Sequence, residues 1–289
     1  MPEKEYQWLN ISLYYSRRSW HSLLVDGLSP FLKSVRQDGS VNRFIIHFNE
    51  QKGENLRICF EVEKPHERLF LTGLSDYFEH FFRSFPGNHA EPKLPIANFI
   101  CDFPSNRVFY HLHRLQPVSS DPFLTKILCD QRCALSQIML EAFRDTVIDQ
   151  EIIETFYLYT GLTLLQAFYT ATGPSLAECL TDRFHCQMDH ADCGIPESVM
   201  QQFTPLLHEM TVEIRDTGNN EAALQWLADW REFCKSQFVP ACVYALHDCV
   251  EISMQAINSF ALLTNIPQRR FKVLTEVLLK FSKVEFINS

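Results

Sequence analysis

Two strand-like runs decide the fold of this chain: RFIIHF at residues 43–48 and NLRICFEV at residues 55–62. Both are rich in β-branched and aromatic side chains, which suit the pleated, half-buried surface of a sheet. A polar segment containing Lys52-Gly53 joins them. The two runs therefore predict a β-hairpin.

The sequence before the hairpin predicts a strand followed by a helix. Residues 6–15 mix β-branched and aromatic side chains, as in a strand with one buried face. Ser19 can cap a helix whose apolar positions recur at helical spacing, and Asp38-Gly39 stops that helix.

The sequence after the hairpin predicts a second helix over residues 65–85, then strands at 96–103 and 107–115. The resulting order, β-α-β-β-α-β-β, is close to a ferredoxin-like split sheet with helices on one face and an open edge. We assign this half to residues 1–120.

From Pro122 onward the pattern is helical, so residues 121–289 predict a helical bundle. The expected helices span residues 123–143, 150–171, 175–188, 197–216, 220–238, 240–264 and 267–283. The fold class is therefore α+β: an N-terminal ferredoxin-like antiparallel or mixed sheet followed by a C-terminal helical bundle. Because the linker at 116–122 is short, we expect the two halves to form one compact unit.

Composition excludes several classes of protein. The 289 residues are 46% hydrophobic and carry a net charge of −9, with no long basic run to neutralise phosphates, so nucleic acid is not an expected partner. No run of about 18 apolar residues predicts a membrane span, and the charged residues 1–5 do not read as a secretory signal. We expect a cytoplasmic protein whose ten cysteines are reduced thiols.

An open sheet edge can bind an extended peptide by strand addition, unless the loop at 86–95 or a second subunit covers it. Arg43, Arg57, Arg107 and Arg114 lie on predicted strands and could hold an acidic peptide, although strand arginines are commonly solvated.

Two groups of residues could bind a metal ion. His111 and His113 share one face of a strand, and residues 185–193 hold His185, His190 and Cys193. Neither matches the four-ligand spacing of structural zinc, so we predict no metal site. The chain contains no phosphate-binding glycine motif and no nucleophile elbow, so we predict no cofactor.

The chain resembles the C-terminal elimination domain of class I lantibiotic dehydratases, which also occurs as the stand-alone thiopeptide-type bacteriocin biosynthesis domain. The resemblance covers most of the chain. Residues 8–14 (WLNISLY) look like the family's first strand, and residues 28–32 (LSPFL) look like its "l-x-P-l-l" element. Residues 44–48 and 54–60 lie where the family has "f-f-I-R-Y" and "x-H-L-R-L-R-F". Residues 124–140, with Asp130, resemble its "F-x-x-D-S" helix.

The departures from the family pattern affect its catalytic groups. Of the paired arginines and histidine that the family carries in the hairpin, only Arg57 is present, and His47 occupies one of the other places. The segment at 103–110 lacks the glutamate and glycines of the family's "Y-x-P-E-x-x-R-Y-G-G", and residues 254–259 lack the histidine and arginine of "H-M-x-x-N-R". Glutamate elimination needs such a base and such cations, so we predict no glutamate-lyase activity and no catalytic residue.

The resemblance implies a role in maturing ribosomally made peptides. The first hypothesis is an accessory protein that binds a precursor (leader) peptide and presents it to other tailoring enzymes. Its expected binding residues are Arg43, His47, Arg57, Arg107, His111 and Arg114. The alternative is a pyridine-forming cycloaddition enzyme that releases the leader, with Tyr14, Tyr15 and Tyr110 as proton donors. A homodimer is left open.

Overall fold

The computed structural model describes residues 5–50, 52–87, 103–111, 121–173, 175–187, 195–217, 224–244 and 249–287. The chain divides into two compact units. The first comprises Met1–Pro117 with Leu140–Ile148 and Leu263–Asn265, and the second comprises Val118–Met139, Asp149–Leu262 and Ile266–Ser289. The sequence pattern predicts a single division at residue 120 instead.

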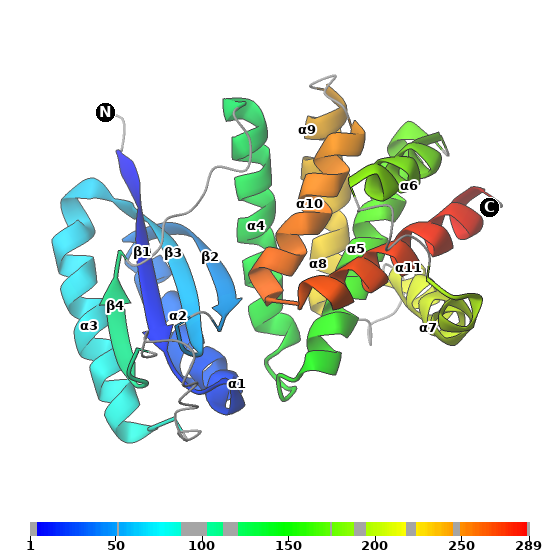
Figure 1. Ribbon diagram of the computed structural model, residues 1–289. Coiled ribbons are helices and arrows are strands. Elements are labelled where there is room, and N and C mark those ends of the chain that lie inside the picture. Colours follow the sequence, from blue (N-terminus) through cyan, green and yellow to red (C-terminus); the bar gives the residue numbers. More distant parts are fainter. Residues whose placement is uncertain are drawn as a thin grey trace. The chain divides into compact units, whose positions relative to one another are not determined.

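The first unit contains a four-stranded sheet in the order β2-β3-β1-β4 (Figure 1). The strands are β1 (Tyr6–Tyr14), β2 (Val41–Asn49), β3 (Asn55–Glu63) and β4 (Arg107–Tyr110), and every neighbouring pair is antiparallel. With one helical crossover after β1 and another after β3, this is the ferredoxin-like topology. The predicted α+β class and the predicted hairpin are confirmed.

Side-chain alternation gives this sheet a core face. Leu9, Ile11 and Leu13 of β1 are at most 2% exposed and lie on the face that α2 (Ser29–Gln37) and α3 (Glu67–Ser84) cover (Figure 1). Aromatic rings fill the space between the helices and the sheet. Phe31 of α2, for example, contacts Phe60 of β3 and Phe78 of α3.

The first crossover is less regular than predicted. A 3-10 turn (Arg17–Ser19) leads into α1 (Trp20–Ser22), a π-helical turn η2 (Leu23–Leu28) and then α2. Ser19 makes no side-chain capping hydrogen bond, so the predicted cap is wrong. The predicted stop is confirmed, because Gly39 follows α2 with φ of 74°.

β4 is shorter than the predicted strand at 107–115. It ends at Tyr110 because His111 has φ of 58°, outside the extended region. Residues 112–115 lie outside the described part, as do 96–102 of the other predicted strand, and Phe103 is not in a strand. The helix predicted at 65–85 is α3, preceded by a 3-10 turn (Lys64–His66).

The second unit is helical. Its elements are α4 (Pro122–Ala142), whose last turn belongs to the first unit, α5 (Gln150–Thr172), α6 (Ser175–Gln187), α7 (Glu197–Asp216), α8 (Gln225–Phe233), the π-helical turn η5 (Cys234–Phe238), α9 (Val239–Tyr244), α10 (Cys249–Thr264) and α11 (Gln268–Ile287). The Asp149 side chain caps α5 by accepting the Ile152 N–H. Among the described helices, none has the length and apolarity needed to cross a membrane.

Candidate functional site

The sheet face opposite α2 and α3 collects most of the predicted binding residues. Alternation along β1 turns Trp8, Asn10, Ser12 and Tyr14 away from α2 and α3, and on that face Trp8 and Asn10 are partly exposed while Ser12 and Tyr14 are buried. The strand register then places the side chains of the neighbouring strands on the same face. The charged and aromatic ones are Arg43, His47, Arg57, Glu61, Arg107 and Phe109, and between them lie Ile45, Asn49, Asn55 and Cys59, of which Ile45, Asn55 and Cys59 are fully buried. We call this surface the polar sheet face.

Arg57 lies at the centre of the polar sheet face. It is opposite Ser12 of β1 on one side and His47 of β2 on the other, and Ser12 is in turn opposite Phe109 of β4. Its side chain is half-buried, and burial lowers the pKa of the guanidinium. Within the described ranges, no carboxylate or hydrogen-bond acceptor pairs with the guanidinium. A half-buried guanidinium without a counterion favours binding of an anionic ligand, which would neutralise its charge.

Arg43 already has its counterion. Its Nε and Nη2 atoms donate to the Glu61 carboxylate at 2.8 and 2.7 Å, and its guanidinium lies 5.7 Å from the centre of the Trp8 ring. Asn42 donates to the same carboxylate at 2.6 Å. The charge of Arg43 is therefore matched inside the protein.

Arg107 begins β4 and His111 follows its last residue, and both are exposed. Arg107 is opposite Tyr14, whose ring contacts Phe103 and Phe109 at centroid distances of 5.1 and 5.3 Å. The His111 backbone N–H donates to the Asn10 carbonyl at 2.8 Å. Arg114, the sixth predicted residue, lies outside the described part of the chain.

Two of the three predicted tyrosine donors lie on the other side of the sheet. The Tyr15 hydroxyl donates to the Phe85 carbonyl at 2.6 Å, and the Tyr110 hydroxyl donates to the Leu71 carbonyl at 3.4 Å. Tyr110 therefore faces the N-terminal half of α3 and Tyr15 faces its C-terminal end, so only Tyr14 is on the polar sheet face.

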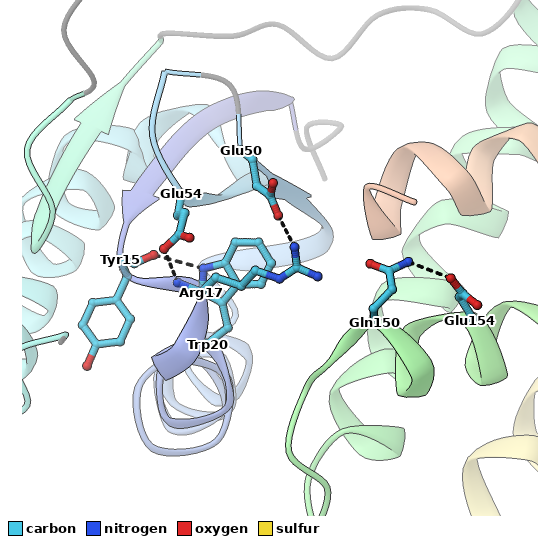
Figure 2. Close-up of polar contacts among 7 residues, drawn as sticks. All are labelled: Tyr15, Arg17, Trp20, Glu50, Glu54, Gln150 and Glu154. Atoms are coloured by element: carbon cyan, nitrogen blue, oxygen red, sulfur yellow. Dashed lines mark hydrogen bonds and ion pairs between the residues drawn. The ribbon is translucent and has the colours of Figure 1, made fainter. Parts of the chain in front are cut away.

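The hairpin loop is tied to the end of β1 by contacts that the sequence analysis did not identify (Figure 2). The Glu54 carboxylate accepts the Arg17 backbone N–H at 2.6 Å, and the Tyr15 N–H donates to the Glu54 carbonyl at 3.1 Å. Arg17 also pairs with Glu50, and the Trp20 indole N–H donates to the Tyr15 carbonyl at 3.1 Å. These contacts fix the end of the hairpin that carries Arg57.

Figure 2 also shows a contact within α5, where the Gln150 side-chain amide donates to the Glu154 carboxylate at 3.0 Å.

The two groups of residues that the sequence offers as metal ligands lie largely outside the described part of the chain. Over the described residues, no cluster of three or more His, Cys, Asp or Glu side chains could hold a metal ion. His113, His190 and Cys193 lie outside that part of the chain, and nothing is described for the His185 side chain.

Neither a protein-family profile nor a curated protein sequence matches this chain. Solved structures do. A pyridine synthase, TbtD, from thiomuracin biosynthesis has a TM-score of 0.65 at 14% identity. The match covers 99% of this chain and 100% of the TbtD chain.

Two further structures share the fold. The tRNA-dependent lantibiotic dehydratase MibB from Microbispora sp. 107891 has a TM-score of 0.68 at 13% identity, covering 97% of this chain but only 28% of its own length. TsrL has a TM-score of 0.54 at 12% identity, and the match covers 98% of this chain and 96% of TsrL. The resemblance read from the sequence is therefore confirmed at the level of fold: this chain shares its architecture with a pyridine synthase and with part of a lantibiotic dehydratase.

Proposed function

We propose that this protein binds a linear precursor peptide during the biosynthesis of a ribosomally made, post-translationally modified peptide. The binding surface is the polar sheet face, and Arg57 is its anchor. The similar structures named for thiomuracin biosynthesis and lantibiotic dehydration support the setting. The half-buried Arg57 guanidinium, which has no carboxylate or hydrogen-bond partner among the described residues, is the observation that carries the proposal.

The chemistry of Arg57 defines what it recognises. A guanidinium offers donors in a planar fork that matches a carboxylate, and charge-assisted bonds of this kind are about twice as strong as neutral ones. A Glu or Asp side chain of the precursor would neutralise Arg57 where no internal carboxylate does. Arg107 adds a second cation on the same face.

Arg43, His47, His111 and Arg114 play smaller parts in this proposal. Because Arg43 already pairs with Glu61, we assign it a structural role on this face and only a small contribution to peptide binding. His47 lies opposite Arg57, and His111 directly follows β4. We place Arg114 in the site on the sequence alone.

Glutamate elimination is not part of the proposed function. The resemblance requires several cations and a histidine in the hairpin, and Arg57 is the one residue of that set in this sequence. The strand partners of Arg57 are Ser12 and His47, and Arg43 is committed to Glu61. We further propose a cytoplasmic location, and other peptide-tailoring enzymes as partners.

Pyridine formation from two dehydroalanine residues is the second candidate. One observation favours it: this chain spans the whole of a pyridine synthase but only 28% of a dehydratase. The tyrosines argue against it, because Tyr15 and Tyr110 donate their hydroxyl protons to backbone carbonyls. Tyr14 is the remaining donor on the polar sheet face.

Fluorescence anisotropy with labelled synthetic peptides tests the proposal. The peptides are those encoded by short reading frames beside the gene, and we expect at least one to bind with a Kd of about 1 µM or tighter. Arg57→Ala should weaken binding about tenfold or more, in line with loss of a charged hydrogen-bonded pair. Arg68→Ala removes the same charge from the exposed surface of α3 and should leave the affinity unchanged.

Equal affinity of Arg57→Ala and the unaltered protein would overturn the assignment of the site. Mass spectrometry after incubation with a peptide containing two dehydroalanines separates the two candidates. Loss of the leader from that peptide would establish the pyridine-forming enzyme in place of the binding protein.

A further inference from the structure

The outer edge of β4 carries backbone groups that point away from the sheet. In an antiparallel pair, alternate residues direct both N–H and C=O toward the neighbouring strand, and the residues between them direct both groups outward. The His111 N–H donates to Asn10, and Phe109 is opposite Ser12, so the odd-numbered residues face β1. Val108 and Tyr110 therefore present their N–H and C=O groups at the edge.

These four groups have no hydrogen-bond partner within the described ranges of the chain. β4 is last in the strand order, with β1 on its inner side. Natural proteins keep such edges short because unpaired strands invite pairing with other chains, and β4 has only 4 residues. We call the outward groups of Val108 and Tyr110 the β4 edge.

The side chains beside the β4 edge define a partner of stated chemistry. Arg107 and Phe109 lie on the polar sheet face and are separated by one residue, so both contact the same face of an added strand. Arg107 is exposed and lacks an ion pair among the described residues, whereas Phe109 offers part of an aromatic ring. Opposite charges and aromatic–aliphatic pairs are the favourable combinations across neighbouring strands.

We propose that the β4 edge binds an acidic peptide as a fifth, antiparallel strand. The inference rests on the proposed function and names how the precursor is held. Antiparallel pairing is more stable per residue than parallel pairing and is the arrangement throughout this sheet. An antiparallel peptide places an apolar residue opposite Phe109 and, two residues later, a Glu or Asp opposite Arg107. The recognised pattern is apolar-x-acidic in the N-to-C direction.

The register also assigns the peptide's own hydrogen bonds. The middle residue lies opposite Val108, so its N–H and C=O both bond to β4. The apolar and acidic residues lie opposite Phe109 and Arg107, which direct their backbone groups to β1. The peptide's N–H groups at those two positions therefore point away from the protein.

A fluorescein-labelled peptide with Val-Thr-Glu flanked by threonines is the probe. Methylating the backbone nitrogen of the central Thr removes an N–H that should bond to β4, and we expect affinity to fall about tenfold or more. Methylating the Glu nitrogen is the matched control and should change affinity less than about twofold. Reversing the order to Glu-Thr-Val, or replacing Glu by Lys, should also weaken binding about tenfold.

A protein variant gives an independent check. Val108→Pro removes one outward N–H without removing a hydrogen bond to β1, a place where edge strands tolerate proline. It should weaken binding of the Val-Thr-Glu probe about tenfold, whereas Val108→Thr keeps the N–H and should bind normally. Circular dichroism confirms that both variants fold.

Three results would overturn strand addition: no binding of the probe up to about 1 mM, equal affinity for the two methylated probes, or equal affinity for the reversed order. A dimer by light scattering that Val108→Pro dissociates would assign the edge to a second copy instead. If Arg57→Ala abolishes precursor binding while methylation of the central residue has no effect, the proposed function stands and strand addition fails.

Discussion

Arg43 and Glu61 lie opposite each other on β2 and β3 and are joined by two hydrogen bonds of 2.8 and 2.7 Å. The Glu61 side chain is 10% exposed and that of Arg43 is 32% exposed, so the pair is partly shielded from water. It ties the edge strand β2 to the centre of the sheet on the face that carries Arg57.

Removing Arg43 should lower the free energy of unfolding by more than the contribution of an exposed surface ion pair. Arg43→Ala leaves the Glu61 carboxylate buried with Asn42 as its remaining side-chain donor among the described residues. We expect a loss of about 2 kcal/mol in the free energy of unfolding, between the values typical of exposed and buried pairs. Urea unfolding measures it. Lys33→Ala, on the exposed side of α2, should lose less than about 0.5 kcal/mol.

The same carboxylate gives stability a dependence on pH. Burial alone would raise the pKa of Glu61, but the hydrogen bonds from Arg43 and Asn42 and the charge of Arg43 outweigh it and hold the pKa below its usual value. The unfolded chain then binds a proton at higher pH than the folded chain does. The contribution is present above pH ~4.5 and is lost as the pH falls through the lower, folded-state pKa.

Unfolding measured at several values between about pH 3 and pH 6 tests this dependence. Glu61→Gln should flatten the acid limb of the stability profile. A profile identical to that of the unaltered protein would show that Glu61 does not titrate differently on folding.

The helical unit contains one close approach that a side chain cannot enter freely. A Cβ atom at Gly161 of α5 would lie 2.8 Å from Leu278 Cδ1 of α11, and Leu278 is fully buried. Gly161→Ala should lose about 1 kcal/mol, because overpacking of about 1–3 kcal/mol exceeds the gain in helix propensity of about 1 kcal/mol.

The double variant separates overpacking from other effects. Leu278→Ala alone should lose about 2–5 kcal/mol. Gly161→Ala combined with Leu278→Ala should lose less than the sum of the two single changes, because the new methyl group enters the vacated space. Simple additivity would contradict the proposed contact.

The aromatic core of the first unit should dominate its stability. Phe78 is fully buried and contacts the rings of Phe31 and Phe82 at 5.5 and 6.0 Å. Phe78→Ala should cost about 3–5 kcal/mol, whereas Leu69→Ala, on the same helix at 76% exposure, should cost less than about 0.5 kcal/mol. Hydrogen exchange of peptides from α3 measures the stability of the first unit separately from that of the helical unit.

Cysteine labelling should follow exposure. Cys179 and Cys186 are exposed, whereas Cys59, Cys234 and Cys242 are buried. Burial also raises the pKa of Cys242 to about 12, which leaves little reactive thiolate at neutral pH. With maleimide at pH 7, mass mapping should find Cys179 and Cys186 modified first, and the buried three only after denaturant is added. Early modification of Cys242 would contradict its described burial.

Much of the site was accessible to sequence analysis. The β propensity of the two hairpin runs placed Arg43, His47 and Arg57 on strands, whereas the register between β2 and β3 is what brings them to one face. The Arg43–Glu61 pair was missed because it depends on the length of the hairpin loop. Once Asn49 is known to lie opposite Asn55, counting residue by residue along the two strands away from the loop places Arg43 opposite Glu61.

The sequence by itself determined the α+β class, the opening strand, the hairpin and the helix that follows it, since these follow from local hydrophobic periodicity and turn chemistry. Only the tertiary structure decided that β4 ends at Tyr110, that Tyr15 and Tyr110 donate to backbone carbonyls near α3, and that Arg43 has a counterion while Arg57 has none within the described residues. Those outcomes depend on which distant segments meet in space, and a pattern of neighbouring residues carries no information about such long-range contacts.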